Sequence, residues 1–330
     1  MILQAANSGF YLKEKIMRKV FLASTALVAL TSVASAADIT VSGSSTFNYK
    51  LISDSEEYGA GNDGNSMAFD SSVSVGSTAT SDSGLTYTTS ADVFDANPVT
   101  NMSVSGDFGT IKILSDGSGD GDAAAMSGDV AADETTGMAD GSVAGAVSFD
   151  GDEAVAGGHV SYASPSISGA NIYLGYTDGG ADNENTTTSM GIKYATEAAG
   201  ASVTLGYASS SADGGADATS MGVSISSGAV ALTLAANSSE TTTGTATDYS
   251  GTSVGLTYTV SDAMAIQMHS KSAENDKDSD YDYSETAVSA TYTIAPGLTS
   301  AITYTSYDYT NNDGDKQDGS ATNVELKVAF

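Results

Sequence analysis

The sequence predicts an all-β protein, a 16-stranded antiparallel transmembrane β-barrel. From Asp38 to the chain end, sixteen short stretches alternate apolar with polar residues, which is the period of a β-strand that is wet on one face only. The connections between these stretches alternate between short and long. A short apolar segment precedes the array, and no apolar run long enough for a spanning helix follows it.

Residues 1–36 are predicted to be a signal peptide, and residues 37–330 the barrel. The segment from Met17 to Lys19 is positively charged, Val20–Val33 is a short apolar run, and Ala34–Ala36 is a cleavage pattern of small residues. The apolar run is too short for a membrane anchor, and Met17 is a candidate translation start. Such a signal implies export from the cytoplasm.

Composition excludes several function classes. The formal net charge is −30, from 11 basic and 41 acidic residues, and the only arginine, Arg18, lies in the predicted signal peptide. A surface this acidic repels nucleic acid and attracts cations, so no nucleic-acid partner is expected. Cysteine is absent, which excludes both a disulfide framework and a thiol nucleophile.

The connections define the orientation of the predicted barrel. Short turns are expected near Thr80–Gly84, Gly106–Gly109, Pro165–Gly169, Thr196–Gly200, Ser226–Gly228, Ser261–Ala263 and Ala295–Gly297. Long loops are expected near Ser55–Ser66, Phe94–Thr100, Ser115–Gly158, Asp178–Ser189, Ser210–Thr219, Asn237–Ser250, Ser272–Ser284 and Thr310–Ala321. Outer-membrane barrels show this asymmetry, with short periplasmic turns and long external loops. We therefore expect the protein in the outer membrane of a Gram-negative bacterium, in contact with its lipid.

Alternation within the strands assigns their two faces. In the closing strand, Val324, Leu326, Val328 and Phe330 share one face, while Glu325, Lys327 and Ala329 share the other. Tyrosines at the ends of such apolar rows fit interfacial girdles: Tyr49, Tyr87, Tyr162, Tyr176, Tyr194, Tyr207, Tyr292 and Tyr304. A soluble β-sandwich alternates equally well, but it explains neither the loop asymmetry nor these tyrosines. Sixteen strands in a closed sheet predict an aqueous lumen.

Several motifs resemble those of the Gram-negative general porins. The segment Tyr162–Ala170 resembles their "Y-x-S-P-x-x-x-G" hairpin, and Gly106–Ile113 resembles their "G-x-F-G" approach to a constriction loop, with Leu114 in place of its last glycine. Thr257–Ser261 and Thr291–Gly297 resemble their turns, as Ala37–Gly43 and Phe330 resemble their ends. The resemblance spans residues 37–330 and is greatest to the alphaproteobacterial branch. It departs in a second respect: the family usually lines one wall of its constriction with arginines, and residues 37–330 contain none.

The resemblance implies that the longest loop, Ser115–Gly158, folds back into the lumen and narrows it. Rings of carboxylates select cations, so its acids are candidate constriction residues together with two lysines on the polar faces of their strands: Asp116, Asp120, Asp122, Asp129, Asp133, Glu134, Lys112 and Lys50. Judged from the residues alone, an ordinary solvated acidic loop explains these acids equally well. Lysines on the inward face are expected in any transmembrane barrel, because a lipid-facing lysine near the bilayer centre costs about 2–4 kcal/mol.

Metal and catalytic patterns are weak. Loose calcium binding has candidate ligands in two acidic clusters: Asp116, Asp120, Asp122, Asp276, Asp278 and Asp280. Neither cluster has the glycine and glutamate positions of a calcium-loop helix pair, so no cofactor is expected beyond weakly bound calcium. The two histidines, His159 and His269, are expected in the wall or in loops, and no catalytic motif stands out.

Three functions remain open at this stage. The sequence favours a passive, water-filled, cation-selective channel for small hydrophilic solutes and ions, and the resemblance adds a homotrimer. The alternative is an acidic calcium-binding surface-layer or adhesin-type structural protein, although the glycine- and aspartate-rich repeats of such proteins are not found. A barrel hydrolase is disfavoured because the sequence offers no nucleophile–base pair.

Overall fold

The computed structural model describes residues 38–54, 64–93, 100–114, 160–177, 186–213, 215–241, 247–275, 277–310 and 316–330. The described chain forms the strands β1 (Asp38–Asp54), β2 (Gly64–Thr80), β3 (Thr86–Asp92), β4 (Thr100–Gly106), β5 (Gly109–Leu114), β6 (Val160–Ala163), β7 (Ala170–Thr177), β8 (Thr187–Ala198), β9 (Ala201–Ala212), β10 (Ala216–Ser227), β11 (Val230–Thr241), β12 (Thr247–Ser261), β13 (Met264–Asn275), β14 (Asp278–Ala295), β15 (Leu298–Thr310) and β16 (Lys316–Ala329). Among these residues, no helix is both long and apolar enough to cross a membrane.

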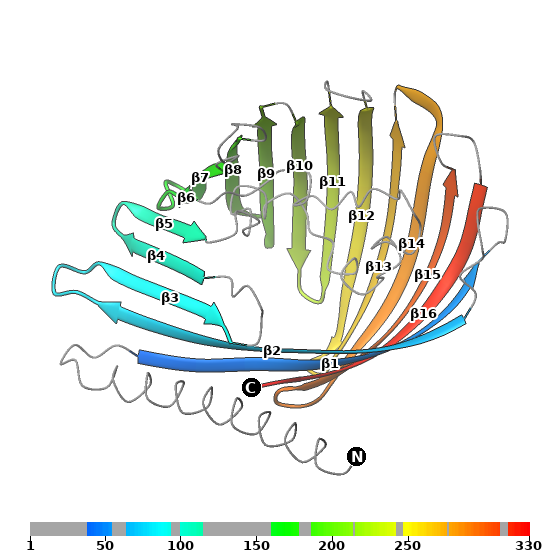
Figure 1. Cartoon of the computed structure of the whole chain (residues 1–330), viewed down its shortest axis with the longest axis horizontal. Helices are drawn as coiled ribbons and strands as arrows, with labels where there is room; N and C mark the ends of the chain where they lie inside the picture. The colour runs from blue at the N-terminus through cyan, green and yellow to red at the C-terminus, as the bar shows by residue number, and fades with distance from the viewer. Residues whose placement is uncertain are drawn as a thin grey trace, which may run out of the picture.

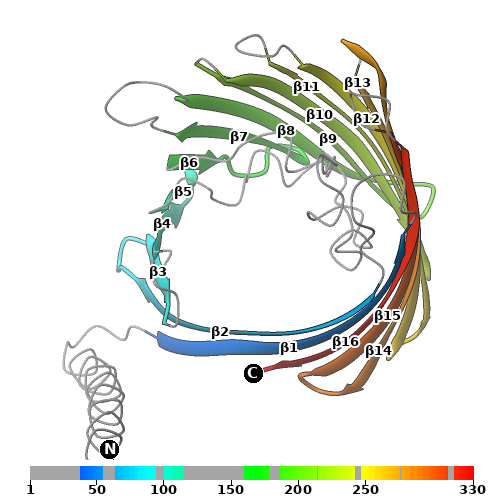
Figure 2. The ribbon, with the colours of Figure 1, turned by 45° about the vertical axis from the view of Figure 1, so that its right-hand side comes forward.

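The strands close into a single antiparallel barrel, as predicted. Each strand pairs with its neighbours in the chain, and β16 returns to pair with β1 from Ser44 opposite Ala329 to Asp54 opposite Gly319 (Figures 1 and 2). Just beyond the ladder, Gly43 and Phe330 exchange two backbone hydrogen bonds of 3.0 Å. A closed sheet has no edge strand, which is the requirement for a sheet in lipid.

One side of the barrel wall, strands β3 to β7, is built from short strands, and we call it the low side. Strands β3 to β7 contain only 4 to 8 residues each, whereas β8 to β16 contain 12 to 18 and β1 and β2 contain 17. Figure 1 shows the short strands β3 to β6 side by side next to the long β1 and β2. Strands β5 and β6, which flank residues 115–159 in the chain, belong to this low side.

The short turns lie where the sequence predicts them, and two of them require glycine. Gly109 has φ of +106°, and a Cβ there would lie 2.1 Å from the Ala163 carbonyl oxygen. Gly169 has φ of +89°, with the Ala195 carbonyl oxygen 2.4 Å from the same position. Any other residue would both strain the backbone and collide with the next strand.

Some external connections are shorter than predicted. The expected loop Ser272–Ser284 is mostly strand, because β13 continues to Asn275 and β14 begins at Asp278. The expected loops Ser210–Thr219 and Asn237–Ser250 are shortened in the same way. The reason is that the outward residues of these strand ends are polar, so the apolar alternation stops although the backbone ladder continues.

Candidate channel lumen

The outer face of the wall is apolar across its middle. Val254, Leu256 and Tyr258 of β12 are each at least 40% exposed, and Val288 and Tyr292 of β14 are similarly exposed. The directly opposed pairs continue this surface around the ring, for example from Val288 to Tyr304. An apolar surface of this extent is unfavourable in water and suits lipid. The predicted outward rows are therefore confirmed.

The tyrosines predicted for the girdles lie on this outer face. Exposed rings include Tyr87, Tyr176, Tyr194, Tyr207, Tyr292 and Tyr304. Tyr162 donates a hydrogen bond of 2.7 Å to the Phe108 carbonyl oxygen in the neighbouring turn. Asn65 donates one of 3.1 Å to the Tyr49 hydroxyl. An apolar ring with a satisfied hydroxyl is the arrangement expected at a membrane–water interface.

The inner face of the wall is polar. Small hydroxyl and amide side chains alternate with the outward apolar ones and are buried in the wall: Ser161, Thr187, Ser189, Ser210, Ser220, Asn237, Ser289, Thr303, Thr305 and Asn323. Several of them bridge neighbouring strands. Thr303 donates to Ser289 over 3.0 Å, and Ser220 donates to the Asn237 side-chain oxygen over 2.6 Å. This polar lining, inside an apolar ring, is the arrangement of a water-filled channel.

Five lysines of the wall have inward parity, as predicted, whereas Lys316 at the external start of β16 has the outward parity of Val324. Lys50 of β1 lies opposite Ser66 of β2 and Asn323 of β16. Lys112 of β5 lies opposite Ser103 and Ser161, two residues before β5 ends at Leu114. Lys50 and Lys112 are thus on different parts of the ring, with β2, β3 and β4 between them. The same parity holds for Lys193, Lys271 and Lys327.

Acidic residues on the inner face partly offset these lysines. Asp70 and Asp92 belong to β2 and β3, and the Ser74 hydroxyl donates a hydrogen bond to Asp92. Glu325 of β16 lies opposite Asn48 and the buried Ala301. The wall therefore carries charges of both signs, although the chain as a whole is strongly acidic. The wall alone does not set a strong negative field in the lumen.

One charged cluster is buried in the inner face, and sequence reasoning did not find it. His269 Nε2 of β13 lies 2.7 Å from Oε1 of Glu285 on β14. The Tyr283 hydroxyl donates to the other carboxylate oxygen, Oε2, over 2.6 Å. Lys271 stands directly opposite Glu285 in the ladder. We call His269, Lys271, Tyr283 and Glu285 the wall cluster; the two hairpin strands bring it together through a register that spacing in the sequence does not reveal.

The structure leaves most predicted constriction residues untested. Lys50 and Lys112 are inward-facing, but the carboxylates all lie outside the described residues: Asp116, Asp120, Asp122, Asp129, Asp133 and Glu134. His159 also lies outside them, whereas His269 is a wall residue, as expected. The constriction therefore stays a prediction.

The calcium candidates are only partly described. Asp116, Asp120, Asp122 and Asp276 fall outside the described residues. The backbones of Asp278 and Asp280 belong to strand β14 instead of the predicted loop, because β14 begins at Asp278. Within the described ranges, no three acidic, histidine or cysteine residues gather as a metal site. Calcium binding stays a prediction as well.

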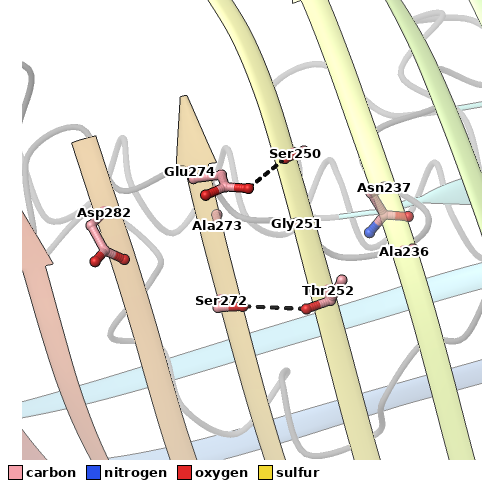
Figure 3. Close-up of a pocket in the computed structure, with 9 residues that line it drawn as sticks. All are labelled: Ala236, Asn237, Ser250, Gly251, Thr252, Ser272, Ala273, Glu274 and Asp282. Atoms are coloured by element: carbon pink, nitrogen blue, oxygen red, sulfur yellow. Dashed lines mark hydrogen bonds between the residues drawn. The ribbon is translucent and has the colours of Figure 1, made fainter. Parts of the chain in front are cut away.

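A shallow polar hollow of about 380 Å³ lies across the external ends of β11 to β14 (Figure 3). Its side chains include Ser250, Thr252, Ser272, Glu274 and Asp282. Thr252 has the parity of the lipid-facing Val254, so the hollow is on the outside of the wall and does not line the lumen. It shows that the tall strands extend beyond the apolar band into polar surroundings.

An ion pair joins two hairpins at this external rim. Lys277, in the turn between β13 and β14, donates to Glu240 Oε1 at the end of β11 over 2.7 Å. The hydrogen bond to Glu240 holds the pKa of Lys277 above its ordinary value, and the charge of Asp248 acts in the same direction. Both partners are solvent-exposed, so this pair contributes little to stability.

Comparisons with solved structures agree with this geometry. An anion-selective porin from Comamonas acidovorans is 14% identical, with a TM-score of 0.62 over 89% of this chain and 100% of that one. A porin refined at 1.8 Å resolution is 17% identical, with a TM-score of 0.63 over 89% and 100%. The trimer form of the outer membrane protein OmpT of Vibrio cholerae is 12% identical, with a TM-score of 0.59 over 89% and 100%. At sequence identities of this size, the structural similarity shows a shared fold and nothing more.

The family is shown by the sequence itself. A search of curated proteins finds no match. The profile of the Gram-negative porins, however, matches residues 23–315, which is most of the chain. This match favours the channel over the surface-layer and hydrolase alternatives. The chain belongs to the Gram-negative porin family and is a non-enzymatic diffusion channel of the outer membrane.

Proposed function

We propose that this porin is a general diffusion channel for small hydrophilic solutes and ions, with a preference for cations. The observation that carries the proposal is the two-faced wall: a closed ring of sixteen strands with hydroxyl and amide groups inside and an apolar surface outside. Hydroxyl and amide groups replace part of the hydration shell of many solutes without selecting one of them.

The cation preference depends on the charges that line the lumen. Inner-face acids such as Asp70, Asp92 and Glu325 offset lysines such as Lys50 and Lys112, so the described wall is close to balanced. The acids of residues 115–159 then decide the sign of the field, and no arginine opposes them. The Comamonas protein is named anion-selective, but at 14% identity its selectivity does not transfer to this chain.

Planar-bilayer recordings of the purified protein test this proposal. We expect stepwise ionic conductance, and under a KCl gradient a zero-current potential of the sign that marks cation preference. A swelling assay with sugars of increasing mass measures the size limit in the same preparation. A stable barrel that conducts no ions would contradict the channel, whereas conductance with an anion-selective sign would contradict only the cation preference.

The homotrimer is part of the proposal. One support is the trimer form of Vibrio cholerae OmpT. The other is an apolar hollow on the outer face of the low side, which is lined by Tyr87, Met102, Val104 and Ile111. A second subunit or lipid would fill this surface. Chemical cross-linking of the folded protein in detergent should give a limit of three chains; a protein that remains monomeric under the same treatment would contradict this assembly.

The proposal also includes a signal peptide for export and the alphaproteobacterial type of porin. Residues 1–36 form the signal peptide, which is removed, and residues 37–330 form the mature barrel, of the type found in the alphaproteobacterial branch. The structure is compatible with this division, because β1 begins at Asp38. N-terminal sequencing of the protein from outer membranes should begin at Ala37. A mature chain that begins well upstream of Ala37 would contradict the signal-peptide boundary.

A further inference from the structure

Histidine is the side chain whose charge ordinarily changes between pH 5 and 8, and the wall cluster holds a buried one. The His269 and Glu285 side chains are 1% and 0% exposed. Both carboxylate oxygens are occupied, Oε1 by His269 and Oε2 by the Tyr283 hydroxyl. Because a carboxylate only accepts, His269 Nε2 carries the proton in this bond. Its Nδ1 is buried and has no hydrogen-bond partner among the described residues.

Among the described residues, the charged and titratable groups near His269 can be named strand by strand. On its own strand, Lys271 shares the inner face. On β14, Glu285 and Tyr283 are the titratable groups, and Ala287 stands directly opposite His269. On β15, the buried Tyr307 lies opposite Glu285. On β12, the residues opposite His269 and Lys271 are Gly255 and Ser253, which are uncharged. With His269 neutral, Lys271 and Glu285 balance; when His269 takes a proton on Nδ1, the cluster gains one positive charge.

The wall cluster lies in the external half of the lumen wall, where its charge acts on passing ions. The outward residues Ser270 and Thr286 mark the row just beyond the apolar band, with Thr286 donating to Ser270 over 3.4 Å. Lys271 and Glu285 project inward from the adjacent positions of the same strands. The cluster therefore belongs to the external half of the lumen wall. In a narrow pore with low-dielectric walls, a fixed charge changes the local concentration of both ions.

We propose that the wall cluster is an acid-sensitive selectivity element: protonation of His269 adds a positive charge to the lumen wall and weakens the preference of the channel for cations. This inference rests on the proposed function and adds a residue and a pH dependence to it. A unit charge about 8 Å from the ion path in water changes cation occupancy roughly twofold. The effect should be largest at low salt, because screening is strong at about 1 M.

The experiment uses the full-length porin in a planar bilayer under a KCl gradient at low salt, titrated from pH 8 to pH 5. The zero-current potential of the wild type should shift toward anions as His269 is protonated. His269→Gln keeps an N–H donor for Glu285 but cannot take the extra proton. The change in zero-current potential between pH 8 and pH 5 should therefore be smaller in this variant than in the wild type. The other histidine gives the matched control: His159→Gln should titrate like the wild type.

Each outcome decides the proposal. It is overturned if the wild-type potential is constant across this range, a result that needs no variant to fold. It is equally overturned if His269→Gln titrates like the wild type, or if His159→Gln is the variant that loses the shift. Glu285→Gln provides a further measurement: it removes the balancing charge and should move the potential toward anions already at pH 8. Ionic conductance without any histidine-dependent shift would leave the channel intact and remove only this inference.

Discussion

At the scale of single residues, the barrel closes through a contact between the two ends of the described chain. The Phe330 ring lies over Gly43, where a Cβ would be 2.7 Å from Phe330 Cζ and 2.8 Å from the Ser72 carbonyl oxygen. The two backbones also exchange hydrogen bonds. Phe330 was predicted to face lipid on the closing strand, and it is 72% exposed. Glycine at residue 43 thus leaves room for the terminal ring.

Changes at either partner should weaken barrel closure. Gly43→Val should lower the free energy of unfolding by roughly 1–3 kcal/mol, because the added side chain overlaps Phe330 and the neighbouring strand. Deleting Phe330 should leave export intact and reduce the heat-resistant, folded fraction. Mobility shifts on unheated gels measure this fraction. Gly64→Ala is the control, since nothing lies within 4 Å of its Cβ position. Normal amounts of folded protein from the truncated chain would contradict a role for the terminal residue.

At the scale of elements, the tall β13–β14 hairpin is held by aromatic packing on the inner face. Tyr283, Tyr307 and Tyr309 are buried together with Ala273 and Ala321. The Tyr283 and Tyr309 rings meet edge to face, with centroids 6.4 Å apart. This packing stabilises the strand ends that were expected to be loop. Aromatic edge contacts add to the area that the rings bury.

Removing one of these rings should cost far more than removing a lipid-facing ring. Tyr283→Ala should destabilise the barrel by about 3–5 kcal/mol, because it leaves a cavity and deprives Glu285 of a buried hydrogen bond. Tyr304→Ala, on the outer face, is the matched control. The temperature at which the folded band disappears on gels reports the difference. Equal losses for both variants would contradict the proposed packing of the hairpin.

The segment between β5 and β6 is the second element with a testable role. If it narrows the lumen, deleting part of Asp120–Asp140 should raise single-channel conductance and admit larger sugars, since sixteen strands enclose a wide lumen. Bilayer recordings and the sugar-swelling assay measure both quantities on the same variant. An assembled barrel with unchanged conductance and size limit would place this segment outside the ion path.

At the scale of the whole molecule, the chain separates its charges by face. The inner face carries lysines such as Lys112 and acids such as Glu285, whereas Glu240, Glu274 and Asp282 are exposed at the outer rim. A net charge of −30 is therefore not by itself a description of the lumen. Selectivity follows from which charges line the path, because exposed charges farther away than a Debye length are screened.

This separation gives a paired test of selectivity. Changing Asp116, Asp120 and Asp122 to Asn should reduce cation preference, because these acids are expected to line the constriction. Changing Glu240 and Glu274 to Gln and Asp282 to Asn removes equal charge from the outer rim and should change the preference much less. The zero-current potential under a KCl gradient is the measurement. Both effects should shrink as the Debye length falls from about 10 Å at 0.1 M salt to about 3 Å at 1 M. Equal shifts from both triple variants would contradict the constriction.

The number of strands, the order of the turns and the face of each strand could be predicted from the residues alone. These are local properties: a period of two in Val324 to Phe330 assigns inside and outside without knowledge of any partner strand. Glycines such as Gly169 mark turns through their own backbone conformation. The inward parity of Lys50 and Lys112 was predictable for the same reason.

The ends of the strands and the contacts between inner residues follow from the folded barrel instead. Above the apolar band the outward residues are polar, so the pattern around Asp278 gave no sign of a strand, although the ladder continues there. His269 and Glu285 share a face by parity, but their contact depends on the register between β13 and β14. Register arises from the summed pairing of whole strands around a closed ring, and no local run of residues contains that information.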